Sequence, residues 1–163
     1  MRLYLVRHGK SDFGPVDETR ELSARGRHDI EQVAQHLAAQ DIRPDRIRHS
    51  TLTRARQTAE IFAAALSPRH GVQELDGVEP WGDVDAFAAL AATWDDNTLV
   101  CGHEPFMGQA AAVLLTGSKS NQVTLVKTGT VMAFERSPYG PAWAMRWMIS
   151  PRLIRGPKAP GEI

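Results

Sequence analysis

Short apolar segments of strand type alternate with longer helical segments along most of this chain, and this alternation constrains the fold more than any other feature. The apolar run RLYLV opens the chain. Residues 23–40 then repeat apolar side chains at helical spacing, with Ser23 as the expected N-cap. Strands that alternate with helices form a parallel sheet covered by helices on both faces. We therefore expect an α/β fold, a three-layer αβα sandwich with a mostly parallel central sheet.

The same alternation continues to about residue 115 and gives way to β-rich sequence after residue 122. Strands are expected in RIRHS (46–50), VQEL (72–75) and NTLVCGH (97–103), and helices over 53–66, 83–94 and 105–115. Further on, QVTLVKTGTVMAFERS predicts two strands joined by a hairpin turn at Thr128 and Gly129, and AWAMRWMIS predicts one more strand. These last strands are expected to be antiparallel.

Length and composition limit the number of domains. The chain has 163 residues and no internal repeat or linker, which fits a single domain over residues 1–155. Residues 156–163 lack apolar periodicity, so we expect a flexible C-terminal tail there. Cys101 is the only cysteine, and an internal disulfide is therefore impossible.

The charge balance limits the class of partner. Lysine and arginine number 19, as do aspartate and glutamate, so no overall basic field attracts nucleic acid or anionic lipid. No apolar stretch approaches the ~20 residues of a membrane-spanning helix, and no signal peptide precedes the first strand. We expect a cytoplasmic, soluble protein that binds neither nucleic acid nor membrane.

Polar side chains follow two of the predicted strands. Arg7 and His8 come directly after the first strand, and His103 ends the apolar run of the strand at 97–103. Glycines lie next to both histidines. Because ligands bind at the carboxyl ends of parallel strands, we expect the two histidines to face each other across one crevice.

The helix at 53–66 adds positive charge to this set. Arg54 and Arg56 lie near its N-terminus, where a cation opposes the positive end of the helix dipole and a bound anion would compensate. A neutral imidazole can attack phosphorus, and the planar guanidinium of arginine suits phosphate oxygens. Two histidines with two or three arginines therefore favour phosphoryl transfer through a histidine nucleophile.

Other reaction classes fail on a missing residue. The GKS at 9–11 would need a glycine at position 4 to form a phosphate loop, and Tyr4 stands there. A cysteine phosphatase built on Cys101 would need an arginine at position 107, which is Met107. There is no G-x-S-x-G motif of a serine hydrolase. The six histidines are scattered without ligand spacing, so we expect no metal site and no cofactor.

Four segments of the chain together resemble the histidine phosphatase superfamily, which includes phosphoglycerate mutases and acid phosphatases. They are LVRHGKS, LSARG (22–26), STLTRARQTAE (50–60) and LVCGHEPFMG (99–108). The short length, EPWGDV (79–84) and MISPRLI (148–154) look most like the SixA-type phosphohistidine phosphatases of that superfamily. The resemblance covers most of residues 1 to about 154 and implies a phosphoglycerate mutase-like fold.

The resemblance also implies a role for each site residue. His8 would be the nucleophile that becomes phosphorylated. Arg7 and Arg54 would hold the phosphate, Arg54 being the arginine of the S-x-x-x-R-A-x-Q-T stretch. His103 would donate a hydrogen bond to the phosphoryl oxygens.

A general acid is harder to assign. Phosphoglycerate mutases carry a glutamate acid in the loop after the third strand. The corresponding segment here, LDGVEPWGDV, offers Asp76, Glu79 and Asp83. Of the three, Glu79 is the best candidate.

The expected function is a metal-independent phosphatase that removes phosphate from phosphohistidine on a protein. A phosphotransfer domain or a carrier of the phosphotransferase system would be such a partner. A phosphatase of small phosphate monoesters on the same fold is the alternative, favoured by a working acid and a closed pocket. A non-catalytic phosphate-binding module is the third hypothesis, and the intact set of Arg7, His8, Arg54 and His103 disfavours it.

Overall fold

One six-stranded sheet organises the fold, as the computed structural model shows for residues 1–140 and 142–156. Its strands are β1 (Arg2–Arg7), β2 (Arg46–His49), β3 (Val72–Glu74), β4 (Thr98–Gly102), β5 (Val131–Arg136) and β6 (Trp143–Ile149). They lie in the order β3-β2-β4-β1-β5-β6. β1, β2, β3 and β4 are mutually parallel, while β5 is antiparallel to both β1 and β6. The expectation of a mostly parallel sheet with antiparallel strands at the end is confirmed.

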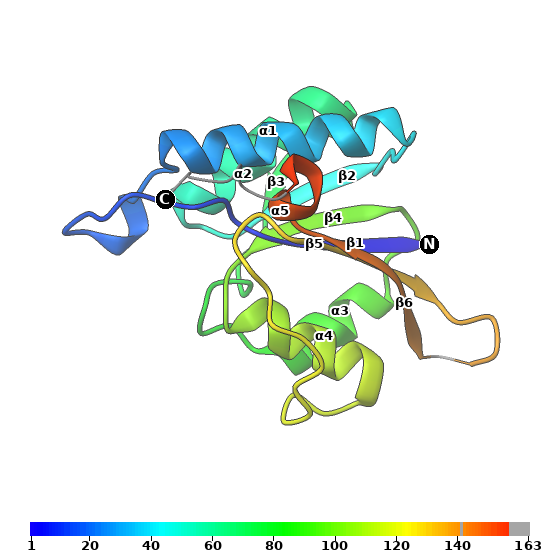
Figure 1. Ribbon diagram of the computed structural model, residues 1–163. Coiled ribbons are helices and arrows are strands. Elements are labelled where there is room, and N and C mark those ends of the chain that lie inside the picture. The colour runs from blue at the N-terminus through cyan, green and yellow to red at the C-terminus, as the bar shows by residue number, and fades with distance from the viewer. Residues whose placement is uncertain (141, 157–163) are drawn as a thin grey trace.

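Helices cover both faces of this sheet (Figure 1). One face carries α1 (Ala24–Ala39), α2 (Thr53–Leu66) and the short α5 (Pro151–Arg155), and the other carries α3 (Val84–Ala92) and α4 (Phe106–Thr116). A single-turn 3-10 helix, η1 (Asp17–Thr19), interrupts the loop after β1. The predicted three-layer αβα sandwich is therefore confirmed.

The core consists of two apolar layers separated by the sheet. Leu3 and Leu5 of β1 pack in the layer of α3 and α4, whereas Tyr4 and Val6 pack in the layer of α1 and α2. Successive side chains of a strand point to opposite faces, so a strand buried on both faces needs an unbroken apolar run. This requirement explains RLYLV, and it leaves the polar residues for the point where β1 ends.

The N-terminus of α1 is fixed close to the loop that follows β1. The Ser23 Oγ accepts a hydrogen bond from the Gly26 N–H at 3.0 Å, which confirms the predicted N-cap. A Cβ at Gly26 would overlap the carbonyl oxygen of Lys10. Glycine at this position therefore allows the helix to lie against the loop.

Residues 122–127 form no strand, so the predicted hairpin is wrong. Both edges of β5 are already paired, one with β1 and the other with β6, and no edge remains for this segment. The segment runs instead past the end of β1, where the Arg7 Nη1 donates to the Val126 carbonyl at 2.8 Å. The Gly129 N–H, at a φ of 76°, bonds the carbonyl of Arg7 at 3.0 Å. The expected turn exists, but it leads to the end of β1.

Two further expectations concern the ends of the fold. The single domain over 1–155 stays a prediction, and its tail lies, apart from Gly156, outside the described residues. The short helix α5 had no counterpart among the predicted elements. No helix in the described ranges is long and apolar enough to cross a membrane.

Candidate active site

A pocket of about 300 Å³ opens where the parallel strands end, which we call the C-terminal edge of the sheet. It is lined by Arg7, His8, Lys10, Ser11, Arg20, Arg54, His103, Glu104 and Thr128. Four of the five residues singled out from the sequence therefore line one pocket. The fifth, Glu79, does not line it.

Hydrogen bonding assigns the protonated nitrogen of His8. Its Nδ1 lies 2.6 Å from the carbonyl oxygen of Gly9, which can only accept, so Nδ1 carries the hydrogen. Its Nε2 accepts from the Nε of Arg54 at 3.3 Å. Burial, with Arg54, Arg7 and Arg20 adding to it, lowers the pKa of His8 to about 4. The imidazole is thus neutral near pH 7, with its lone pair on Nε2.

Gly9 ties the residue after His8 to α2. Its N–H donates to the Thr58 Oγ1 at 3.1 Å, and that hydroxyl donates to the Arg54 carbonyl at 2.7 Å. A Cβ at Gly9 would come within 2.8 Å of the Ile30 side chain. The chain can therefore approach α1 this closely only without a side chain at position 9.

Gln57 holds the far end of the same loop. Its Oε1 accepts from the Leu22 N–H at 2.8 Å, and its Nε2 donates to the Glu21 carboxylate at 3.0 Å. Arg54, Gln57 and Thr58 stand at i, i+3 and i+4 and share one face of α2. The sequence analysis assigned no role to Gln57 or Thr58. Their spacing from Arg54, on an otherwise alanine-rich helix, is the pattern that could have identified them.

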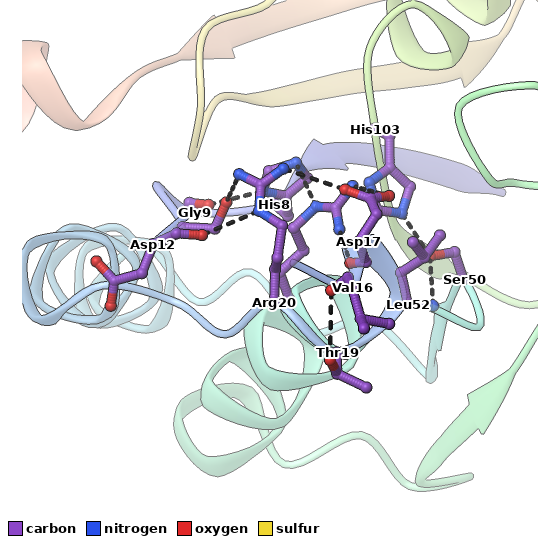
Figure 2. A network of polar contacts seen from close by, with 12 residues as sticks. His8, Gly9, Asp12, Val16, Asp17, Thr19, Arg20, Ser50, Leu52 and His103 are labelled. Atoms are coloured by element: carbon purple, nitrogen blue, oxygen red, sulfur yellow. Dashed lines mark hydrogen bonds and ion pairs between the residues drawn. The ribbon is translucent and has the colours of Figure 1, made fainter. Parts of the chain in front are cut away.

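His103 lies beside His8, with the two ring centroids 5.0 Å apart. Its Nε2 is 2.5 Å from the Ser50 Oγ (Figure 2), which also accepts from the Leu52 N–H. When the Ser50 hydroxyl donates to Nε2, the Nδ1 of His103 carries the hydrogen of the ring. Burial, with His8 and Arg54 adding to it, lowers the pKa of His103 to about 3. In that tautomer the neutral ring presents Nδ1–H as a donor, and the role of His103 as a donor to phosphoryl oxygens stays a prediction.

Two buried side-chain nitrogens of the pocket residues have no hydrogen-bond partner among the described residues. They are the Nδ1 of His103 and the Nε of Arg7, both buried. Buried polar atoms in proteins are nearly always paired, and each exception needs an explanation. The oxygens of a phosphoryl group are acceptors that donors of this kind bind.

Arg54 is almost fully buried, although it carries a charge. Its Nη1 donates to the Asp17 carbonyl at 2.8 Å, and its Nη2 lies 3.3 Å from the Asp17 carboxylate. The same carboxylate accepts from the Arg20 Nη1 at 3.1 Å (Figure 2). Burial opposes ionisation of Asp17, but the two guanidiniums together hold its pKa below the ordinary value. Asp17 thus joins the loop after β1 to the site through Arg54.

Arg56, the other arginine of this helix, lies outside the pocket. Its Nη1 pairs with the Glu60 carboxylate at 3.0 Å, and both side chains are about half exposed. Such an exposed i, i+4 pair contributes little to stability. The two arginines therefore have separate surroundings, with only Arg54 beside His8.

Two glutamates near the site differ in what their carboxylates contact. Glu104 lines the pocket, accepts from the Gly108 N–H at 2.8 Å, and has a pKa raised by burial. The sequence gave it no role, although it follows His103 directly. Glu79 is 3% exposed and bonds Thr51 through Oε1 and Gly77 through Oε2. Its role as an acid stays a prediction.

The other two candidate acids, Asp76 and Asp83, do not line the pocket. Asp83 is the N-cap of α3 and accepts from the Asp85 and Ala86 N–H groups. Asp76 is exposed and does not line the pocket.

In the part of the chain that the structure describes, no three histidine, cysteine, aspartate or glutamate side chains come together as metal ligands would.

Known proteins resemble this chain in sequence. The model of the histidine phosphatase superfamily (branch 1) matches residues 3–82. Phosphohistidine phosphatase SixA of Escherichia coli is 27% identical, over 98% of this chain and 99% of that protein. An uncharacterized protein of Picosynechococcus is 34% identical, over 80% of this chain and 83% of that protein. The chain belongs to the histidine phosphatase superfamily, and its full-length similarity to SixA supports phosphatase activity.

Within that superfamily the chain is SixA-like. The structure of the protein histidine phosphatase SixA complexed with tungstate matches with a TM-score of 0.84 at 24% identity, covering 93% of this chain and 97% of that one. The α-ribazole phosphatase of Shigella flexneri matches with a TM-score of 0.73 at 18% identity, with the same coverage. At these identities the two likenesses show the fold alone.

Proposed function

We propose that this protein hydrolyses phosphohistidine on a protein through a covalent phosphoryl intermediate on His8. One observation carries the proposal. His8 is a neutral imidazole whose Nδ1–H bonds the Gly9 carbonyl, so its Nε2 lone pair is directed toward the cation Arg54. A neutral nucleophile beside guanidiniums is what attack on a phosphoryl group requires.

In the first half-reaction the Nε2 of His8 attacks phosphorus. The P–N bond of the substrate breaks, and its electron pair leaves with the substrate imidazole, which takes up a proton from solvent water. Positive charge grows on the His8 ring, and the Gly9 carbonyl at Nδ1 stabilises it. Arg7 and Arg54 balance the negative charge on the phosphoryl oxygens.

The second half-reaction regenerates the enzyme. Water attacks the phosphorus, the P–Nε2 bond breaks with its electron pair returning to His8, and inorganic phosphate leaves with the protons of water. In both steps the Nδ1–H of His103 and the Nε–H of Arg7, both buried and unpaired among the described residues, would donate to the phosphoryl oxygens. A neutral histidine N–H and a cationic guanidinium N–H can both donate hydrogen bonds to an oxyanion.

The leaving group favours phosphohistidine over an ester. An imidazole has an unperturbed pKa of about 6.5, so it takes a proton near neutral pH and leaves without a placed acid. An alkoxide needs one. Both carboxylate oxygens of Glu79 already accept hydrogen bonds, which supports a reaction that does not depend on it. The full-length similarity to phosphohistidine phosphatase SixA of Escherichia coli points the same way.

A second candidate function is hydrolysis of a small phosphate monoester. Glu104 favours it, because a carboxyl group with a raised pKa in the pocket can give a proton to an alkoxide. The Gly108 N–H bonds one of its oxygens and leaves the other without a hydrogen bond among the described residues. Hydrolysis of a monoester would therefore use Glu104 as a general acid, whereas hydrolysis of phosphohistidine needs no such acid.

Hydrolysis of the two substrate classes distinguishes these functions. We expect the wild type to prefer a phosphohistidine protein to alkyl phosphates, and Glu79→Gln and Glu104→Gln to leave that preferred activity nearly unchanged. General acid catalysis is typically worth about 10²–10⁴-fold, so the loss of a true acid would be plain. A wild type that prefers an alkyl phosphate and loses it in Glu104→Gln would establish the monoesterase instead.

A further inference from the structure

Ser50 bonds the ring of His103 because the register of the sheet brings two strand ends together. Ser50 comes directly after β2, and His103 comes directly after β4. The two strands are parallel with His49 opposite Cys101, and the Ser50 N–H donates to the Cys101 carbonyl at 3.1 Å. Ser50 is 0% exposed and His103 is 1% exposed. The sheet, rather than a surface loop, therefore fixes the contact between the two side chains.

The hydroxyl of Ser50 has two hydrogen-bond partners among the described residues (Figure 2). Its Oγ lies 2.5 Å from the Nε2 of His103 and 3.3 Å from the backbone nitrogen of Leu52. The Leu52 N–H can only donate, so it occupies a lone pair of the oxygen. The Nε2 of His103 is then the acceptor that remains for the hydroxyl hydrogen.

The reverse arrangement would leave two buried groups unpaired instead of one. If Nε2 carried the hydrogen and donated to Ser50, the serine hydrogen would have no acceptor among the described residues, and Nδ1 would be a lone pair without a donor. When the serine donates, only the Nδ1–H is unpaired, and a phosphoryl oxygen can accept from it. Unpaired buried polar groups cost free energy, so the arrangement with serine as donor is favoured.

Ser50 can act on the pocket only through His103. His103 lines the pocket, whereas Ser50 does not. Within the described ranges no other residue bonds either ring nitrogen of His103. Without the serine hydroxyl, no hydrogen bond would select the form of the ring that has its hydrogen on Nδ1.

We propose that Ser50 is a positioning residue that makes His103 a hydrogen-bond donor in the pocket. The hydroxyl donates to Nε2, holds the ring in place and keeps its hydrogen on Nδ1, where phosphoryl oxygens can accept it. This inference rests on the proposed function and deepens it, because it names the group that prepares one of the donors. Preorganised donors of this kind stabilise the charge that develops in the transition state.

Thr51 provides a matched control. It is the next residue along the chain, and its hydroxyl donates to the Glu79 carboxylate at 3.0 Å instead of to His103. Two adjacent hydroxyls near the site thus serve different partners. Thr51→Ala removes one of them without touching the ring, and Ser50→Ala removes the other.

The first test measures the tautomer and needs no substrate. Nitrogen chemical shifts of labelled histidine, with His103 assigned through His103→Gln, distinguish a protonated Nδ1 from a protonated Nε2. In the wild type and in Thr51→Ala we expect the hydrogen of His103 on Nδ1. In Ser50→Ala we expect the Nε2–H form to appear. A wild-type ring with its hydrogen on Nε2 would overturn the proposal, whether or not Ser50→Ala folds.

The second test measures hydrolysis of a phosphohistidine protein. Loss of one preorganised donor usually costs about 10²–10³-fold in turnover, so kcat of Ser50→Ala should fall by about tenfold or more, with little change in KM. Thr51→Ala should stay near the wild-type rate. In a His103→Ala background, Ser50→Ala should cost nothing further, because the hydroxyl acts through the ring. Circular dichroism checks that each variant is folded.

Three kinetic or spectroscopic results would overturn the role of Ser50. They are a Ser50→Ala variant with the wild-type kcat, one that keeps the Nδ1–H form, and one that loses as much activity in the His103→Ala background as in the wild type. A wild type that hydrolyses no phosphohistidine protein would reject the proposed function instead. The tautomers of the wild type and Ser50→Ala would still decide whether the serine controls His103.

Discussion

At the scale of single residues, the carbonyl of Gly9 governs the chemistry of His8. A backbone carbonyl has no hydrogen to give, so it holds the proton of the imidazole on Nδ1 and leaves Nε2 with the lone pair. When the Ser50 hydroxyl donates to the Nε2 of His103, the Nδ1 of that ring keeps its hydrogen. The two neighbouring histidines are then one acceptor and one donor.

The first prediction concerns the charge of His8. Because burial and the nearby arginines lower its pKa to about 4, the ring should stay neutral from pH 7 down to about pH 5 and become protonated only near pH 4. An ordinary histidine would protonate through pH 6.5. Nitrogen chemical shifts of labelled histidine, assigned with His8→Gln, measure both the pKa and the Nδ1–H tautomer. Titration of His8 near pH 6.5, or an Nε2–H tautomer, would contradict the account.

At the scale of elements, α2 both buries and aligns the site. Its apolar face, including Ala59 and Phe62, packs in the core, while its polar stripe of Arg54, Gln57 and Thr58 bonds the loop after β1. The register of one helix therefore decides which arginine reaches His8. If the register of α2 shifted by two residues, Arg56 would take the place of Arg54 beside His8.

Substitution of the two arginines tests this register. Arg54→Ala should lower turnover by about 10²–10³, the usual cost of one preorganised charge-stabilising donor. Arg54→Lys should not restore it fully, because an ammonium group lacks the planar fork. Arg56→Ala is the control on the same helix and should be mild, since Arg56 only pairs with Glu60 at the surface. Steady-state rates with an essential Arg56 and a dispensable Arg54 would reverse the assignment.

The elements also show what the sequence can predict. Strand and helix periodicity identified the sheet and its helices, and the rule that ligands lie at strand ends brought His8 and His103 together. Residues 122–127 were mispredicted because alternation does not reveal whether a sheet edge is free. The positions of Asp17 and Arg20 depend on the path of an irregular loop, and that of Glu104 on the start of α4. No periodic pattern encodes such positions.

At the scale of the whole molecule, charge is balanced overall but not at the site. The chain has no net formal charge, yet the pocket lining holds Arg7, Lys10, Arg20 and Arg54 against Glu104 alone. The fold concentrates positive charge where the strands end. An oxyanion therefore finds a local field that the composition does not reveal.

This arrangement predicts metal-independent activity. The guanidiniums already supply the positive charge that balances the phosphoryl oxygens in the transition state. Hydrolysis of a phosphohistidine protein should therefore survive exhaustive treatment with EDTA at wild-type rate. If EDTA abolished the activity and a single divalent ion restored it, a bound metal ion would supply the positive charge that is here assigned to the guanidiniums.

The central claim is that His8 takes the phosphoryl group, and trapping that group measures it most directly. Brief reaction with a ³²P-labelled phosphohistidine protein, followed by alkaline quenching and peptide mapping, should find acid-labile, alkali-stable phosphate on His8. His8→Ala should take up no label and lose turnover, while its circular dichroism stays that of the folded wild type. Label on any other residue, or turnover by His8→Ala near the wild-type rate, would contradict the mechanism.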